Sequence, residues 1–158
     1  MKEFFGVFGK TVIFVYAFNK TFYMLIVKLG GTDKQLYELV APLVMSPAII
    51  RQNNNYPYKT SRNHIWYLAS EQGQVLGFIP VKTGDNGALI DNYWFRGDDM
   101  QVADALLESV TGDFGDAGLL SALVHKRHVE TFGTHGFVTT KIWSKYDKMQ
   151  YRKQPAQE

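Results

Sequence analysis

The sequence predicts one α/β domain, built on a central mixed sheet with helices on both faces. Two observations predict it. Short apolar runs of strand length alternate with amphipathic segments at helical spacing, and glycine-containing turns separate them. The 158 residues, of which 46% are apolar and 20% charged, are enough for one hydrophobic core. This composition excludes disordered, collagen-like and coiled-coil chains.

The chain begins with two apolar runs, residues 11–18 and 21–29, separated by Asn19 and Lys20. Neither reaches the ~20 apolar residues that a membrane helix needs. Their Phe, Val, Ile and Tyr content favours strands that turn at Asn19-Lys20. We expect residues 1–23 to be an N-terminal extension, either added strands or sequence upstream of a start at Met24, with a membrane anchor as the alternative. The domain is expected over residues 24–153, followed by a tail at 154–158.

A strand and a capped helix open this domain. Residues 24–29 form a short apolar strand candidate, and Thr32 starts a T-x-x-Q capping box. Apolar residues then recur at helical spacing from Leu36 to Leu43, and Pro42 is expected to end or kink the helix. Residues 49–62 are polar with scattered aromatics, which is typical of a short helix and a substrate-facing loop.

The second half continues with strands and helices in alternation. Residues 64–71 and 75–82 predict a hairpin, in which Pro80 cannot donate to a ladder and is expected at an edge or a bulge. The remaining pattern predicts a strand at 88–95, a helix at 99–110, a strand at 119–124, a short helix at 126–134 and a final hairpin at 137–153 that turns at Tyr146-Asp147.

Composition also limits the chemistry. The chain has no cysteine, which excludes disulfides, Cys-ligated metals and a thiol nucleophile, and which suits a cytoplasmic protein. His125 and His128 lack an evident third ligand, so no metal site is expected.

The charges are balanced overall and uneven locally. With 17 basic and 15 acidic residues, the total argues against nucleic acid as a partner. Residues 125–153 hold seven bases and two acids, which keeps nucleic acid as an alternative. Residues 85–116 hold eight acids and one arginine, either a solvated face or an acidic mouth that attracts a cationic substrate.

The order of these elements resembles the GNAT-type N-acetyltransferases, the acyl-CoA N-acyltransferase superfamily. The resemblance covers residues 24–152 and rests on four features: the strand and capped helix at 24–43, the hairpin LASEQGQVLGFI at 68–79, the helix with ALLE at 105–108, and Gly136-Phe137 before a strand. It implies an enzyme that moves an acetyl or other acyl group from acetyl-CoA or another acyl-CoA to an amine of a small molecule or macromolecule. By analogy it also implies a homodimer.

Two departures from the family pattern favour a different function. The family's Q/R-x-x-G-x-G/A loop brings backbone amides to the CoA diphosphate. Here residues 98–103 read DDMQVA, with Asp98 at the Gln/Arg position, Gln101 at a Gly position and only Ala103 matching. Phe132 stands where the family often has a general-acid Tyr. The alternative is a catalytically degenerate GNAT-fold binding module without CoA binding, in which Asp98 or Asp99 caps a helix.

The resemblance also implies which residues contact the donor. The residues expected at the thioester and pantetheine are Asn92, Tyr93, Trp94 and Phe95, and those at the diphosphate are Met100, Gln101, Val102 and Ala103.

Candidate bases and acceptor residues follow from position and chemistry. His125 is the first candidate base because it ends a strand, where open α/β sheets bind ligands, and because its unperturbed pKa near ~6.5 suits proton transfer. Asp91 on the neighbouring strand is the second, and the alternative for His125 is a surface histidine. Tyr56, Tyr58 and Arg62 are expected in the acceptor pocket, or else packed against the hairpin.

Overall fold

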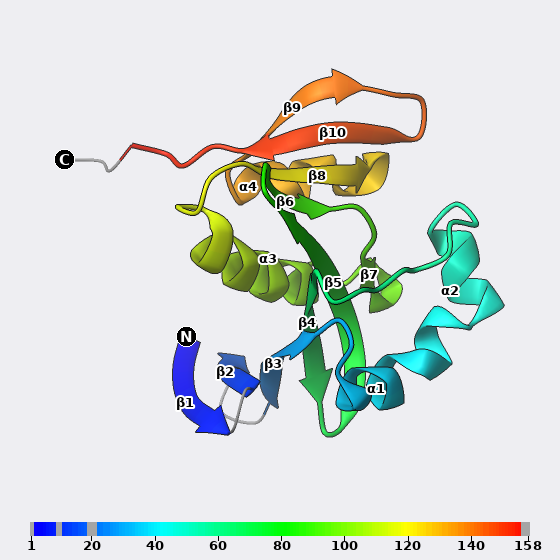
Figure 1. The fold of residues 1–158 in the computed structure, drawn as a ribbon, viewed down its shortest axis with the longest axis vertical. Coiled ribbons are helices and arrows are strands. Elements are labelled where there is room, and N and C mark those ends of the chain that lie inside the picture. Colours follow the sequence, from blue (N-terminus) through cyan, green and yellow to red (C-terminus); the bar gives the residue numbers. More distant parts are fainter. Residues whose placement is uncertain (1, 9–10, 19–21, 156–158) are drawn as a thin grey trace.

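A computed structural model describes residues 2–8, 11–18 and 22–155, with side chains from Met24 onward. The predicted α/β fold with a central mixed sheet is confirmed (Figure 1). The strands are β1 (Lys2–Phe8), β2 (Thr11–Phe18), β3 (Phe22–Gly30), β4 (His64–Glu71), β5 (Gln74–Gly84), β6 (Gly87–Ile90), β7 (Trp94–Phe95), β8 (Leu120–His125), β9 (Phe137–Ile142) and β10 (Tyr146–Tyr151). The α-helices are α1 (Lys34–Val44), α2 (Pro47–Gln52), α3 (Met100–Phe114) and α4 (Val129–Thr134).

The strands follow the order β1-β2-β3-β4-β5-β6-β8-β10-β9, and β7 pairs with β5 beside this path. Neighbouring strands run antiparallel except β6 and β8, which are parallel. The connection from β6 to β8 contains α3, as a parallel pair requires a crossover. The sheet therefore consists of two antiparallel halves that meet at the β6–β8 pair.

Two hydrophobic clusters cover opposite faces of the sheet. Successive side chains of a strand point to opposite faces. On β4, Tyr67 packs in the cluster that holds α3 and α4, and its neighbour Trp66 packs in the cluster that holds α1. On β5, Ile79 and Phe78 divide in the same way. The expected helices on both faces are thus confirmed.

The N-terminal apolar runs are strands. β2 pairs with β3, and β1 pairs with β2, both antiparallel, so the sheet extends beyond β3. The expected turn at Asn19-Lys20 lies outside the described residues. Within the described residues, no helix is long and apolar enough to cross a membrane.

The start of α1 differs from the prediction by one residue. Asp33, not Thr32, is the N-cap, because its carboxylate accepts the N–H of Gln35 at 2.9 Å. Pro42 lies inside α1 and does not end it, since the helix continues to Val44.

The predicted strand at 88–95 is broken, and this break shapes the molecule. β6 stops at Ile90, where it pairs with Val81 of β5 and Ala122 of β8. The chain leaves the ladder over residues 91–93 and rejoins β5 alone as β7. After Ile90 the chain therefore parts from β8, and an opening forms at the carboxyl ends of β6 and β8.

Pro80 lies opposite this break. It pairs with Trp66 of β4 inside the sheet, so of the two expectations, an edge or a bulge, the edge position is wrong and an irregular ladder lies beside it. Along the other edge of β5, the paired strand changes from β7, which pairs at Phe78, to β6, which pairs at Val81. A residue without an amide donor is tolerated where the ladder is interrupted.

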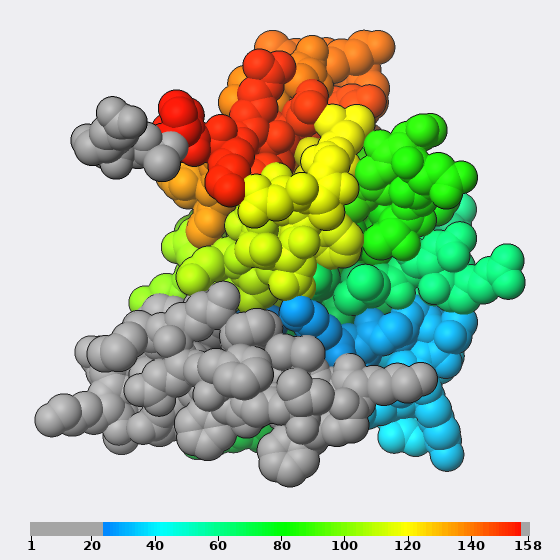
Figure 2. All heavy atoms as spheres, turned by 60° about the vertical axis from the view of Figure 1, so that its left-hand side comes forward, coloured from blue at the N-terminus to red at the C-terminus, as the bar shows by residue number. Residues whose placement is uncertain are grey.

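The C-terminal hairpin turns earlier than predicted. Tyr146 and Asp147 belong to β10, and the turn is closed by the Trp143 N–H donating to the Tyr146 carbonyl at 2.8 Å. The other end of β10 packs on the end of α3, where a Cβ added to Gly115 would lie 2.8 Å from a ring carbon of Tyr151. Figure 2 shows this side of the molecule, with the end of α3 in yellow beside the C-terminal segment in red.

Candidate functional site

A cavity of about 400 Å³ lies at the opening between β6 and β8. Three parts of the chain form its wall: the loop after α2, the break after β6 and the C-terminal hairpin with β8. The lining residues are Tyr56, Pro57, Lys59, Asp91, Asn92, Leu123, Trp143 and Tyr146. On β8, Leu123 lies between Ala122 and Val124, which belong to the cluster that holds α3 and α4, here called the α3-side cluster. Because successive side chains of a strand point to opposite faces, the cavity opens on the sheet face away from α3.

Two asparagines of the loop after α2 hold this wall together. Asn53 is buried, and its Nδ2 donates to Asn92 Oδ1 and to the carbonyl of Tyr56, both at 2.9 Å. Asn54 has a left-handed backbone (φ 53°), and its Nδ2 donates to the hydroxyl of Tyr146 at 2.8 Å. Asparagine adopts this conformation more readily than most residues. The loop is thereby tied to the break after β6 and to β10.

His125 lies behind this wall. Its side chain is buried, its Nε2–H donates to Asn53 Oδ1 at 3.2 Å, and its Nδ1 accepts from Asn54 Nδ2 at 3.4 Å. Burial, with a smaller effect of Arg127 and His128, lowers the pKa of His125 to about 4. His125 is therefore not the surface histidine of the alternative, and it does not have the unperturbed pKa on which its choice as first candidate base depended. The residue that meets the cavity here is Tyr146, whose ring centroid lies 4.8 Å from that of His125.

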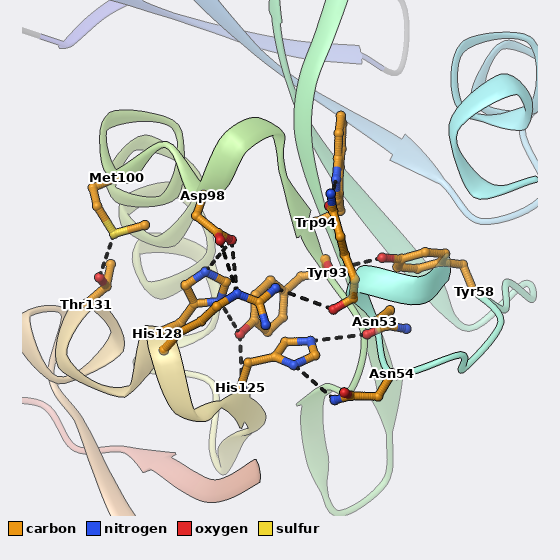
Figure 3. Close-up of polar contacts among 12 residues, drawn as sticks. Asn53, Asn54, Tyr58, Tyr93, Trp94, Asp98, Met100, His125, His128 and Thr131 are labelled. Carbon is orange, nitrogen blue, oxygen red and sulfur yellow. Dashed lines mark hydrogen bonds and ion pairs between the residues drawn. The ribbon is translucent and has the colours of Figure 1, made fainter. Parts of the chain in front are cut away.

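A second hydrogen-bonded chain crosses the opening on the α3 side. Tyr93 is 3% exposed, and its hydroxyl accepts the backbone N–H of His125 at 3.1 Å and donates to His128 Nδ1 at 2.8 Å. The Nε2–H of His128 donates to Asp98 Oδ1 at 2.8 Å (Figure 3). Burial raises the pKa of Tyr93 and lowers that of His128, so both are neutral near pH 7.

Asp98 also forms an ion pair with Arg127. The Nε of Arg127 lies 3.2 Å from both carboxylate oxygens. Burial opposes ionisation, but the hydrogen bonds from Arg127 and His128 outweigh it and lower the pKa of Asp98. Gly97 and Asp98 both have positive φ, 59° and 52°, and this backbone turns Asp98 toward Arg127. The N-cap of α3 is Asp99, which accepts the N–H of Gln101 at 2.9 Å, so the two acids have different partners.

The residues expected at the thioester divide between the two sheet faces. Asn92 lines the cavity, and Tyr93 and Phe95 are buried in the α3-side cluster. Trp94 faces the other cluster, and its Nε1 donates to Gln52 Oε1 at 3.0 Å. Phe132, at the family's general-acid position, is fully buried with its ring 5.2 Å from that of Tyr93.

The residues expected at the diphosphate form the first turn of α3. Val102 and Ala103 are buried in the core, and Gln101 is exposed. Met100 Sδ accepts the hydroxyl of Thr131 at 2.8 Å, which links α3 to α4.

Among the residues expected at the acceptor, Tyr56 lines the cavity. Tyr58 packs edge-on against Phe78 and donates its hydroxyl to the carbonyl of Tyr93 at 3.3 Å. Arg62 is exposed and lies outside the cavity lining that is described.

Sequence reasoning missed Asn53, Asn54, Trp143 and Tyr146. A run of asparagines was the available signal, because such residues favour left-handed turns. In the described part of the chain, no group of three or more potential ligands could hold a metal ion.

No family model matches the chain, and no curated protein does. Solved structures match it over most of its length. ElaA from Escherichia coli aligns with a TM-score of 0.63 at 11% identity, covering 82% of this chain and 99% of that one. An acyl-CoA N-acyltransferase from Pseudomonas aeruginosa aligns with a TM-score of 0.60 at 14% identity, covering 80% and 99%. The PaiA N-acetyltransferase from Thermoplasma acidophilum, solved in complex with coenzyme A, aligns with a TM-score of 0.53 at 15% identity, covering 82% and 99%. The chain therefore has the fold of the GNAT-type acyl-CoA N-acyltransferases.

Proposed function

We propose that this protein transfers an acyl group from an acyl-CoA to an amine. The observation that carries the proposal is the parting of the chain from β8 after the Ile90–Ala122 pair, with a cavity of about 400 Å³ at the opening. Residues 91–93 lie outside any strand there, so their backbone groups can bind a thioester carbonyl and the amides of a pantetheine arm. The coenzyme A bound to the Thermoplasma protein of the same fold supports CoA as the carrier.

We assign the proton acceptor to Asp91. Acyl transfer to nitrogen requires that an ammonium group lose a proton before its nitrogen can attack the carbonyl carbon of a bound thioester. As the C–N bond forms the C–S bond breaks, and CoA leaves as a thiolate that takes up the second proton, the one that the attacking nitrogen loses. Asp91 lines the cavity, whereas His125 lies behind Asn53 and Tyr146. The geometry thus supports Asp91 as base and His125 as a positioning residue that holds Asn53 and Asn54. This order reverses the expectation from the sequence.

The two halves of an acyl-CoA fit this site unequally. The backbone of Asp91 and Asn92, which lies outside any strand, suits the thioester half, whereas the carbonyl of Tyr93 already accepts from Tyr58. At the diphosphate end, Arg127 and His128 supply a cation and an N–H group, but both bind Asp98. The N–H of Gln101 is taken by Asp99. A diphosphate would therefore have to displace the Asp98 carboxylate from Arg127.

The contact between Asp98 and Arg127 favours a second candidate function, a GNAT-fold binding module that does not use CoA. Asp98 bridges the loop before α3 to the segment before α4, and the Tyr93 hydroxyl bridges the opening behind it. The buried Phe132 offers no proton to a leaving thiolate. In this candidate the cavity binds a ligand and no transfer follows.

Calorimetric titration with acetyl-CoA and free CoA separates the candidates. The variants are Asp98→Asn, which removes the charge and tolerates a positive φ, and the control Asp116→Asn, whose carboxylate pairs with Lys153. Acyl transfer predicts that wild type binds acetyl-CoA, that Asp98→Asn binds it about tenfold more tightly, and that Asp116→Asn behaves as wild type. Absence of binding to wild type and to Asp98→Asn at millimolar ligand would exclude CoA and leave the binding module.

A further inference from the structure

The cavity has a composition that selects its ligand. Three of its lining residues are aromatic (Tyr56, Trp143 and Tyr146), and its acidic lining residue is Asp91. We propose that the acceptor is a compact monoamine, an inference that rests on the proposed function. Its ammonium group is held at Asp91, and its flat apolar body lies against the three aromatic rings.

The aromatic rings are accessible and large. Tyr56 is 59% exposed and Trp143 is 40% exposed, which is unusual for two such residues beside one cavity. The Tyr56 and Tyr146 rings meet edge-on, with centroids 6.4 Å apart. Aromatic faces bind both flat apolar groups and cations. Trp143 already shows this property, since Lys141 Nζ lies 5.4 Å from its ring centroid.

The walls are fixed before any ligand arrives. Asn53 holds the carbonyl of Tyr56, and Asn54 holds the hydroxyl of Tyr146. Asn53 and Asn54 are in turn bonded to the buried ring of His125. Ordering the binding residues in advance reduces the entropy lost on association, so a small ligand can bind here with few contacts.

The charges select one ammonium group. Asp91 lies at the break after β6, where the thioester half of the donor is proposed to bind, and Asn92 Oδ1 beside it accepts from Asn53. A cation placed at Asp91 therefore brings its nitrogen to the reacting position. Lys59 is exposed at the same cavity and repels a second ammonium group, which disfavours diamines. The volume of about 400 Å³ suits a compact molecule and not a folded protein surface.

The test compares matched ligands by calorimetry on the full chain, each with and without saturating free CoA. The probes are 2-phenylethylamine, 2-phenylethanol, n-butylamine and 1,4-diaminobutane. We expect 2-phenylethylamine to bind about tenfold more tightly than the alcohol, which lacks the charge, and than the two aliphatic amines, which lack the ring. Equal affinity for the alcohol or tighter binding of the diamine would overturn the proposal, as would failure of every probe to bind at millimolar concentration.

Variants locate the binding. Asp91→Asn should weaken 2-phenylethylamine about tenfold and leave 2-phenylethanol unchanged, because only the charge is removed. Trp143→Leu should weaken both ligands. The matched control is Asp85→Asn, a carboxylate in the β5–β6 turn that lines a different cavity. If Asp85→Asn weakens the amine as much as Asp91→Asn does, the effect is general electrostatics and the proposed site is wrong.

These titrations can contradict the proposed acceptor and the proposed function separately. Selective binding of 2-phenylethylamine without binding of CoA would keep aromatic monoamines as the ligands of the cavity and exclude acyl transfer. Binding of CoA without discrimination among the amines would keep acyl transfer and exclude this acceptor.

Discussion

His125 shows how one buried side chain controls the behaviour of the site. Its ring contributes as a neutral group that donates to Asn53 and accepts from Asn54. A histidine with a pKa of about 4 stays neutral throughout the physiological range, so it holds the two asparagines without a change of charge. The residue that ends β8 is thus suited to positioning.

The depressed pKa of His125 predicts the pH dependence of stability. Between its unfolded pKa near 6.5 and its folded pKa of about 4, the unfolded chain binds the extra proton. The free energy of unfolding should therefore be greatest above pH 6.5 and fall as the pH is lowered through that window, by up to about 1.4 kcal/mol per pH unit for each such proton.

Urea unfolding at several pH values from 7.5 to 4.5 checks this expectation. His125→Gln should flatten the curve, although His128, whose pKa is also lowered, retains part of the slope. The control variant is His135→Gln, at a half-buried ring that pairs with Asp104 on the surface of α3 and not with Asn53 or Asn54. A wild-type stability that stays constant over this window would contradict the burial of neutral His125.

Tyr93 provides a second prediction for a single residue. Its hydroxyl serves His125 N–H and His128 Nδ1 at once. Tyr93→Phe leaves two buried polar groups without this partner, so we expect a loss of about 1–3 kcal/mol in the free energy of unfolding. Tyr37→Phe, at an exposed tyrosine of α1, should change nothing measurable. Chemical denaturation of the three proteins checks both expectations.

At the scale of elements, β5, β7 and α3 meet so closely that one glycine is required. A Cβ at Gly77 would lie 2.8 Å from the carbonyl oxygen of Trp94 and 2.8 Å from a methyl group of Val102. Gly112, inside α3, has open space at the same position. The first glycine brings the strand after the break against the helix, and the second has no packing role.

These two glycines predict opposite effects of the same substitution. Gly77→Ala should lower the free energy of unfolding by about 1–3 kcal/mol, because β7 or α3 must move. Gly112→Ala should raise it by about 0.5–1 kcal/mol through helix propensity. Thermal and chemical unfolding measure both, and a stabilising Gly77→Ala would show that β7 does not pack on β5 as described.

The elements themselves were largely predictable. Apolar runs of strand length and helical periodicity around Leu36 and Leu106 indicated most strands and helices, because these signals are local. The break after Ile90 was missed although Asp91 and Asn92, two polar residues that favour turns, mark it, because apolar residues of a strand-length run stand on both sides of them. The hairpin turn was wrongly predicted at Tyr146 because aspartate, here Asp147, is common in turns. The Asp147 carboxylate instead accepts from the Thr139 hydroxyl across the hairpin.

At the scale of the whole molecule, three contacts join the acidic segment to the basic segment. Acids of residues 85–116 pair with bases of residues 125–153. The pairs are Asp98–Arg127, Asp104–His135 and Asp116–Lys153. Asp91 is the acid of this segment that lines the cavity, and the three paired acids lie outside that lining. Contacts such as Asp98–Arg127 join residues far apart in sequence, which is why spacing could not reveal them.

The two hydrophobic clusters share β4 and β5, and this predicts a single cooperative transition. Leu36→Ala in the α1-side cluster and Leu106→Ala in the α3-side cluster should each lower the midpoint of one common transition, because neither face can lose its cover alone. Each should cost about 2–5 kcal/mol. Far-ultraviolet circular dichroism and tryptophan fluorescence should report the same midpoint, and two separated transitions would contradict the shared strands.

The parallel seam between β6 and β8 has an elastic consequence. Three residue pairs, from Ala88–Leu120 to Ile90–Ala122, join the two halves of the sheet. On one face α3 and α4 clamp both halves, and on the other face the cavity leaves the seam uncovered beside Leu123. The stiffness of this uncovered face therefore depends on the hydrogen bonds that join the loop after α2 to both halves of the sheet, from Asn53 to Asn92 and from Asn54 to Tyr146.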